Sequence, residues 1–185
     1  PKLMYTLRTS PCYKSEVLPR YDEIIRQTLT SVLNIQLIDD QWLQATLPVR
    51  YGGLGIRTAT DLALPAFLAS ISGAQDLILQ ILPSHLHETS GLEDVDFTDA
   101  CTKWSSMFLG GWIPEGETAA IQKSWDLPLV TLKATSMLAT APNQTSKARL
   151  IVVAAPHAGD FLQAVPMTAT GTRLDRTSLR IAIAL

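Results

Sequence analysis

A glycine-rich stretch at residues 47–57 is the part of this sequence whose composition comes closest to a ligand-binding loop. It reads Leu-Pro-Val-Arg-Tyr-Gly-Gly-Leu-Gly-Ile-Arg. Glycine-rich loops cradle phosphates when they follow a strand and open a helix. Here Thr58 stands where a dinucleotide fingerprint has its third glycine, no strand pattern precedes the stretch, and the Gly-Lys-Ser/Thr of a P-loop is missing. The other interpretation is a shaped connection between helices, whose structural turn is formed by Pro48, Gly52, Gly53 and Gly55.

No combination of residues forms a recognisable catalytic or metal site. A Gly-x-Ser-x-Gly elbow, a His-Glu-x-x-His motif and a Cys-x-x-Cys pair are all missing. His85 and His87 lie two residues apart, but a zinc site needs more ligands than these. Cys12 and Cys101 are far apart, so we expect two small core residues in a reducing compartment. The sequence therefore predicts no catalytic residue, no metal and no cofactor in this chain.

Charge is distributed unevenly along the chain. Residues 1–60 carry a net charge of +2, residues 61–120 carry −8, and residues 121–185 carry +4, which gives the overall −2. Phosphate groups are bound by clustered lysines and arginines. A phosphate-binding surface would therefore lie on the first and last thirds, and the middle third should repel nucleic acid.

Length and composition indicate a globular chain. The 185 residues are 46% apolar, enough for one domain or two small ones. The longest unbroken apolar run, Leu150 to Ala155, is far shorter than the roughly 20 residues that span a bilayer. No leader pattern opens the chain, and it starts without methionine, which indicates a piece of a longer protein. We expect an intracellular protein, cytoplasmic or nuclear, with no membrane partner.

The hydrophobic pattern of the first half predicts helices around the glycine-rich stretch. Residues 1–14 are expected to be extended or a short helix. Apolar residues at helical spacing predict a helix over 15–36 with Ser15 as cap, and a short helix over 39–46 capped by Asp39 or Asp40. Thr58 should cap a long helix to Leu82, which Pro65 kinks or divides. Its small residues would admit a close neighbour: Ala63, Ala66, Ala69, Ser70 and Gly73.

The second half is predicted as shorter helices after an acidic loop at 83–97. Helices are expected over 98–109 with Thr98 as cap, over 115–125, and, after a break at Pro128, over 129–138. Residues 145–155 are favoured as a helix capped by Thr145 or Ser146, although Ile-Val-Val has strand propensity. A turn of helix at Asp160, a loop or short strand at 166–173 and a capped helix over 175–185 complete the chain. The fold class is mainly α, an irregular helical bundle of about six to nine helices with long loops.

Several phrases, in their order along the chain, resemble the region that directly follows the polymerase domain in non-LTR retrotransposon reverse transcriptases. The first half supplies Pro1-Lys-Leu-Met-Tyr-Thr-Leu-Arg-Thr-Ser-Pro-Cys12, Trp42-Leu-Gln-Ala-Thr-Leu-Pro-Val-Arg-Tyr-Gly-Gly-Leu-Gly-Ile56 and Ala66-Phe-Leu-Ala-Ser70. The second half supplies Ala148-Arg-Leu, Ala155-Pro-His-Ala-Gly-Asp-Phe-Leu162 and Leu179-Arg-Ile-Ala. The phrases cover nearly the whole chain.

The resemblance implies a helical thumb and linker. It places a thumb-like part at 1–82, with the glycine-rich turn 47–57, and a linker-like part at 98–185, unless the two form one continuous domain. The family's Tyr-x-Asp-Asp turn, zinc-knuckle cysteines and nuclease carboxylates are absent here. The chain would be a non-catalytic fragment of a parent polypeptide that is an RNA-directed DNA polymerase, and the rest of that polypeptide would be its partner.

The function that the resemblance implies is binding of an RNA or DNA template–primer through a basic face. A thumb holds the duplex by its phosphates with little base specificity. Each basic residue has an equally acceptable role as a solvated or ion-paired side chain. The candidate nucleic-acid-binding residues are Lys2, Arg8, Lys14, Arg50, Arg57, Lys147, Arg149, Arg173, Arg176 and Arg180.

A second hypothesis is a helical protein–protein interaction scaffold, as a decayed or co-opted fragment of such an element. The stripe of small residues from Ala63 to Gly73 and the net negative charge favour it. A stable oligomer that does not bind nucleic acid would favour the scaffold over the thumb.

Overall fold

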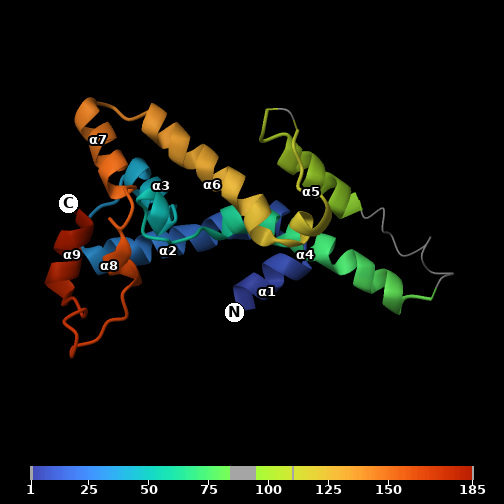
Figure 1. Ribbon diagram of the computed structural model, residues 1–185, viewed down its shortest axis with the longest axis horizontal. Helices are drawn as coiled ribbons and strands as arrows, with labels where there is room; N and C mark the ends of the chain where they lie inside the picture. Colours follow the sequence, from blue (N-terminus) through green and yellow to red (C-terminus); the bar gives the residue numbers. More distant parts are fainter. Residues whose placement is uncertain (1, 84–94, 110, 185) are drawn as a thin grey trace. The chain divides into compact units, whose positions relative to one another are not determined.

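The computed structural model describes residues 2–83, 95–109 and 111–184. Within these ranges the chain is entirely helical, with nine α-helices, three short 3₁₀ helices and no strand, so the mainly α class is confirmed (Figure 1). The α-helices are α1 Lys2–Thr9, α2 Val17–Leu33, α3 Asp39–Thr46, α4 Ala59–Ile81, α5 Val95–Ser105, α6 Gln122–Ala139, α7 Gln144–Val153, α8 Asp160–Gln163 and α9 Arg176–Ala184. The 3₁₀ helices are η1 Cys12–Lys14, η2 Val49–Tyr51 and η4 Gly116–Ala120.

The chain folds into two compact units, each built from two separate segments. Unit 1 comprises Pro1–Asp22 and Thr58–Thr131, and unit 2 comprises Glu23–Arg57 and Leu132–Leu185. This division does not follow the order of the parts expected from the sequence, because each half of the chain contributes to both units. The thumb-like and linker-like parts stay predictions. Of the expected acidic loop, residues 84–94 lie outside the described residues, and the loop's last residues form the first turn of α5.

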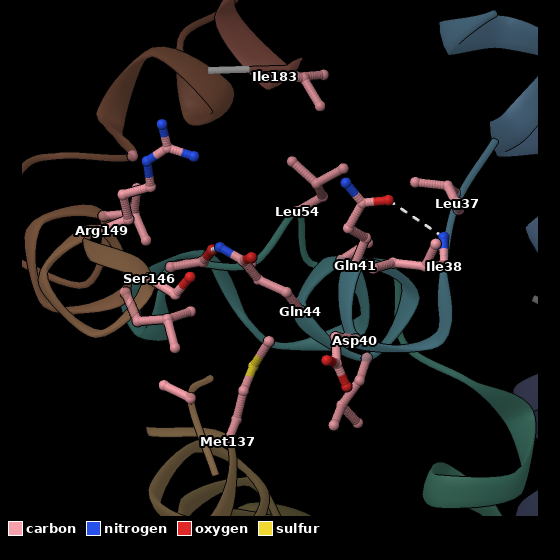
Figure 2. Close-up of a pocket in the computed structure, with 18 of the residues that line it drawn as sticks. Leu37, Ile38, Asp40, Gln41, Gln44, Leu54, Met137, Ser146, Arg149 and Ile183 are labelled. Atoms are coloured by element: carbon pink, nitrogen blue, oxygen red, sulfur yellow. Dashed lines mark hydrogen bonds between the residues drawn. The ribbon is translucent and has the colours of Figure 1, made fainter. Parts of the chain in front are cut away.

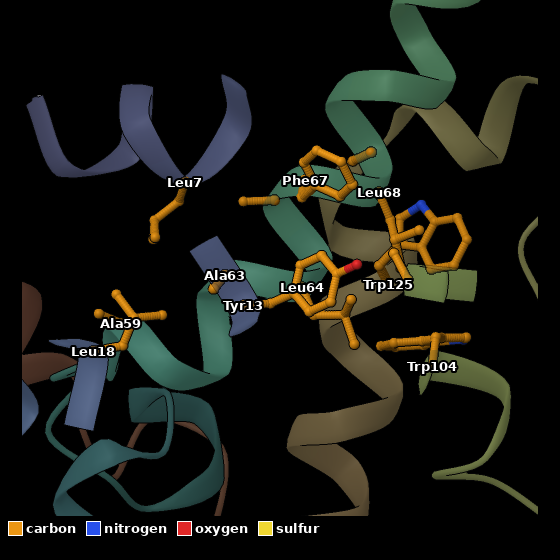
Figure 3. Packing of buried hydrophobic residues seen from close by; sticks show 13 residues of the cluster. Leu7, Tyr13, Leu18, Ala59, Ala63, Leu64, Phe67, Leu68, Trp104 and Trp125 are labelled. Atoms are coloured by element: carbon orange, nitrogen blue, oxygen red, sulfur yellow. The ribbon is translucent and has the colours of Figure 1, made fainter. Parts of the chain in front are cut away.

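Helix α4 is the centre of unit 1. Its first half is buried among side chains from α1, η1, α5 and α6, including Leu7, Tyr13, Trp104 and Trp125 (Figure 3). The indole rings of Trp104 and Trp125 meet edge to face with centroids 5.3 Å apart, an arrangement that aromatic pairs favour. Three of the five small residues expected on α4 lie in this core, whereas Ser70 is half-buried and Gly73 is exposed. Ala63, Ala66 and Ala69 are buried, as close helix packing requires.

The start of α4 is fixed as the sequence predicts. The Thr58 hydroxyl accepts a hydrogen bond of 3.3 Å from the backbone N–H of Asp61. A second cap was not predicted: Asp22, on α2, is buried and accepts from the backbone N–H groups of Ala59 and Thr60 at 2.6 and 3.0 Å. The first N–H groups of a helix have no partner within it, so these two side chains satisfy the first turn of α4.

By length and composition, α4 could also cross a membrane. The prediction from sequence considered only unbroken apolar runs and therefore did not detect this helix. A few polar residues interrupt α4, but its average hydropathy stays high. Of its most apolar window, 39% is buried inside the protein. We interpret α4 as the core helix of unit 1, and the absence of a membrane partner stays a prediction.

Unit 2 is built around the connection between α3 and α4. Gly52 has φ +77°, a left-handed conformation that glycine adopts without strain, and ends η2. A Cβ on Gly53 would overlap the carbonyl oxygens of Leu47 and Gln44, and a Cβ on Gly159 would overlap Val49. The glycines therefore allow the segment before α8 and the end of α3 to lie against η2 with no space for a side chain.

Several predicted helix boundaries are wrong. The break at Pro128 does not occur, since α6 continues through it from Gln122 to Ala139, with Trp125 and Val130 buried on either side. Burial of these side chains outweighs the hydrogen bond that proline removes. Helix α5 begins before Thr98, and Asp39 is the first residue of α3, not its cap.

The ends of α7 and α9 are also informative. The cap of α7 is Asn143, whose side chain accepts a hydrogen bond from the Ser146 N–H at 2.8 Å. The predicted caps, Thr145 and Ser146, lie inside the helix instead. The strand propensity of Ile-Val-Val is overridden, because these residues lie within α7. Asp175 caps α9 as expected, accepting from the N–H groups of Thr177 and Ser178 at 2.8 and 2.9 Å.

Candidate nucleic-acid interface

The two units carry charges of opposite sign. Unit 2 contains nine basic and five acidic side chains, a net charge of +4, and unit 1 contains six basic and twelve acidic ones, a net charge of −6. Along the sequence the first and last thirds together carry +6 and the middle third −8, so the two units divide the charge slightly less sharply than the sequence order does. A polyanion would be attracted to unit 2 and repelled by unit 1.

The predicted binding residues divide between these units. Three lie in the acidic unit 1, and the other seven lie in the basic unit 2. The members in unit 1 are Lys2, Arg8 and Lys14; those in unit 2 are Arg50, Arg57, Lys147, Arg149, Arg173, Arg176 and Arg180.

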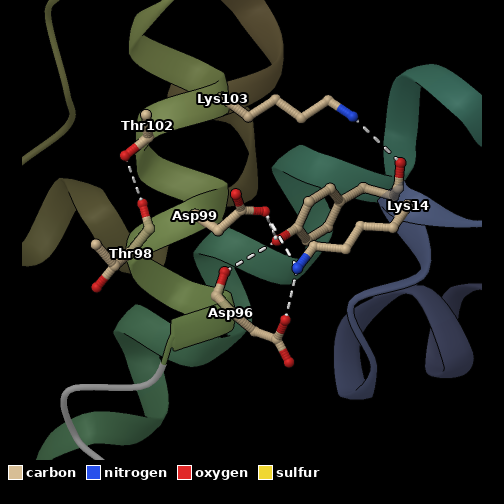
Figure 4. A network of polar contacts seen from close by, with 7 residues as sticks. Lys14, Asp96, Thr98, Asp99, Thr102 and Lys103 are labelled. Carbon is tan, nitrogen blue, oxygen red and sulfur yellow. Dashed lines mark hydrogen bonds and ion pairs between the residues drawn. The ribbon is translucent and has the colours of Figure 1, made fainter.

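In unit 1, Lys14 is held by two carboxylates. Its ammonium lies 2.7 Å from Asp96 and 3.2 Å from Asp99, both on α5 (Figure 4). The Tyr13 hydroxyl lies within donating distance of the same residues, 2.9 Å from the Asp96 carbonyl oxygen and 3.1 Å from the Asp99 carboxylate. The ammonium of Lys103 completes the group by donating to the Tyr13 carbonyl oxygen at 3.4 Å. This network ties η1 to α5 and compensates the charge of Lys14.

Burial and hydrogen bonds within this network shift the pKa values of Tyr13, Lys14 and Asp99. Burial, followed by the hydrogen bond to Asp99, raises the pKa of Tyr13 to about 12. Hydrogen bonds to Asp96 and then Asp99 raise the pKa of Lys14, and the bonds from Lys14 and then Tyr13 lower the pKa of Asp99. Each partner is stabilised in the protonation state that the other needs. The arrangement is an ion-paired link between elements, and it contains no group poised to exchange a proton near neutral pH.

The other two candidates in unit 1 are exposed. Arg8 donates from its guanidinium to the Gln122 side chain at 3.0 Å, and Lys2 lies on the first turn of α1. Neither has a carboxylate partner within the described residues, but both lie in a unit whose net charge is −6.

In unit 2, several candidates extend into solvent. Lys147, Arg149 and Arg173 are exposed. Arg50 lies over the ring of Tyr51, 5.1 Å from its centroid, and Arg180 donates from Nε to the Val32 carbonyl oxygen at 3.1 Å. Arg57 is half-buried and already has an interaction within the protein, and Arg176 is the first residue of α9.

Unit 2 also contains a cavity of about 550 Å³. Residues from α3, the glycine-rich turn, the second half of α6, α7, the segment through α8 and α9 line it (Figure 2). Gly52 and Gly53 contribute backbone to its wall. Of the ten predicted binding residues, Arg149 is the one that lines the cavity within the described part of unit 2. The glycine-rich turn and a predicted cation therefore meet at one concave surface.

Sequence reasoning missed two groups that the structure brings together. Asp96 was placed in the acidic loop and Asp99 in the helix after it, but both lie on α5, one helical turn apart, a spacing that would have indicated a shared face had the helix start been known. Asp40, which lines the cavity, was considered as a cap alone. Among the described residues there is no cluster of metal-binding side chains. The residues His85 and His87 lie outside that part of the chain.

The chain matches no family model, no curated protein and no solved structure. The likeness to retroelement reverse transcriptases therefore rests on the sequence phrases, and it stays a prediction.

Proposed function

We propose that this chain is a non-catalytic helical module of a retroelement reverse transcriptase, and that it binds a template–primer duplex through the basic unit 2. The observation that carries the proposal is the separation of charge, +4 on unit 2 against −6 on unit 1. The phrase order supports the family, and the charge supports unit 2 as the part that contacts the duplex.

Phosphate contacts would supply most of the affinity. Lys147 and Arg173 are exposed and have no ion-pair partner within the described residues, so their charges are available to phosphates. Arg50 lies close to the glycine-rich turn on the same unit. Binding of this kind releases counterions and depends weakly on base sequence.

The test compares two single-charge variants. A fluorescently labelled RNA–DNA hybrid is titrated with the full chain, with Lys147→Gln in unit 2 and with Arg20→Gln, an exposed arginine in unit 1. We expect Lys147→Gln to weaken binding several-fold and Arg20→Gln to leave it nearly unchanged. Equal losses in the two variants would contradict the assignment of the interface to unit 2.

A scaffold function is the second candidate, and one observation in unit 1 favours it. Beyond the core, α4 exposes Leu77, Leu79 and Ile81, which are 56%, 39% and 70% accessible. Leu77 and Ile81 lie one helical turn apart on the same face, and exposed apolar patches can mark protein contacts. Light scattering after size exclusion distinguishes the functions, since a scaffold gives a stable oligomer that does not bind the hybrid.

A further inference from the structure

The cavity of unit 2 has two charged side chains on its wall, and they have opposite signs. Arg149 comes from α7 and Asp40 from α3, and Figure 2 shows them on different sides of the cavity. Within the described residues neither has a hydrogen-bond or ion-pair partner for its side chain. By contrast, the neighbouring Asp39 pairs with Arg26 at 2.8 Å.

The amide side chains on the same wall are already engaged. Gln41 accepts from the Ile38 backbone N–H at 3.1 Å, and Gln44 donates to the Gly52 carbonyl oxygen at 3.0 Å. The strongest hydrogen-bonding groups left for a ligand are therefore one guanidinium and one carboxylate. They define a ligand with an anionic group at one end and N–H donors at the other.

The remaining wall is largely apolar. Leu54, Met137 and Phe161 are among the side chains that line it. A volume of about 550 Å³ lies within the range of small-molecule sites, which are typically apolar with a few polar groups that fix orientation. Such walls suit a flat ring, because bases stack favourably on apolar and aromatic side chains.

We propose that this cavity binds one guanine nucleotide of an unpaired strand, with its phosphate at Arg149 and its base edge at Asp40. Guanidinium and phosphate match geometrically, through two parallel hydrogen bonds. The guanine edge offers two neighbouring N–H donors, which a carboxylate accepts with its two oxygens. Because Arg149 is exposed, the phosphate stays at the mouth, where a strand continues in both directions. The choice of ligand rests on the proposed nucleic-acid function.

The experiment measures binding of guanosine 5′-monophosphate, guanosine and adenosine 5′-monophosphate to the full chain by calorimetry. Wild type should bind the guanine nucleotide about tenfold more tightly than either of the others. Arg149→Gln should bind guanosine and its monophosphate equally. Asp40→Asn should bind the guanine and adenine nucleotides equally.

Two variants remove the same charges away from the cavity. Arg20→Gln, at an exposed arginine of unit 1, is the control for Arg149→Gln, and Asp39→Asn, next in sequence to Asp40 and outside the cavity wall, is the control for Asp40→Asn. Both controls should retain the wild-type preferences. All four positions are exposed, so the helical circular dichroism signal should not change.

The proposal is overturned if wild type binds no guanine nucleotide, or if Arg149→Gln and Asp40→Asn behave like their controls. Loss of nucleotide binding while the RNA–DNA hybrid still binds would refute the cavity assignment alone. Binding of the nucleotide without binding of the hybrid would instead refute the proposed function, and the cavity would stand as a mononucleotide site.

Discussion

The carboxylate of Asp22, on α2, accepts a hydrogen bond of 2.6 Å from the backbone N–H of Ala59, the first residue of α4. The two residues are 37 positions apart in sequence, and both are buried. A charged acceptor at a helix N-terminus also benefits from the helix dipole. This bond anchors the central helix of unit 1 to the end of the unit's first segment.

Replacing Asp22 with asparagine should destabilise unit 1 by about 1–3 kcal/mol, because one acceptor is lost and buried N–H groups are left with weaker partners. Urea unfolding followed by circular dichroism measures the loss. Glu23→Gln, the adjacent exposed carboxylate, is the control and should change stability by less than about 0.5 kcal/mol. Equal stability of the two variants would show that the cap is dispensable.

Replacing glycines of the glycine-rich turn with alanine should destabilise the protein to different degrees. Gly55 has φ +72°, and a Cβ there would meet the Val49 side chain at an ordinary contact distance of 3.7 Å, so Gly55→Ala should cost about 1–2 kcal/mol from backbone strain. Gly53→Ala should cost more, because the new Cβ would overlap the carbonyl oxygens of Leu47 and Gln44. Thermal unfolding of both variants checks the order. A Gly53→Ala protein as stable as Gly55→Ala would mean that the turn relaxes freely.

The ion pair of Lys14 and Asp99 predicts a loss of stability in acid. Contacts with Lys14 and then Tyr13 hold the pKa of Asp99 below its usual 3.8, so the folded state favours the ionised carboxylate. Its contribution is therefore fully present above the unfolded pKa and is lost as pH falls through the lower folded pKa. Urea midpoints at pH 5 and pH 3 should differ less in Asp99→Asn than in wild type. An unchanged difference would exclude this carboxylate as a source of acid sensitivity.

Local signals predicted the parts of the fold that depend on a few neighbouring residues. Thr58 and Asp175 act as caps as expected, because a cap is decided within one helical turn. Pro128 was read as a helix end by the same local logic, which failed because buried neighbours hold α6 together. Burial of that kind depends on residues distant in sequence and has no local signature.

The sequence indicated which parts of the chain are basic, but it did not indicate which charged residues the fold brings together. Seven of the ten candidates from the first and last thirds lie in the basic unit 2, yet no pattern indicated that Lys14 would meet Asp96 and Asp99 on another helix. The cavity is formed by segments on both sides of α4 in the sequence, so Asp40 and Arg149 are brought to the same cavity by the fold alone.

The salt dependence of hybrid binding tests the central claim most directly. Association of an RNA–DNA hybrid with wild type is measured at several salt concentrations, beside a variant carrying Arg50→Gln, Lys147→Gln and Arg173→Gln. Wild type should give a slope of log affinity against log salt of about −3 or steeper, and the variant a slope shallower by about 3, one for each phosphate contact removed. A flat wild-type slope, or the same slope in both proteins, would contradict a phosphate-binding face on unit 2.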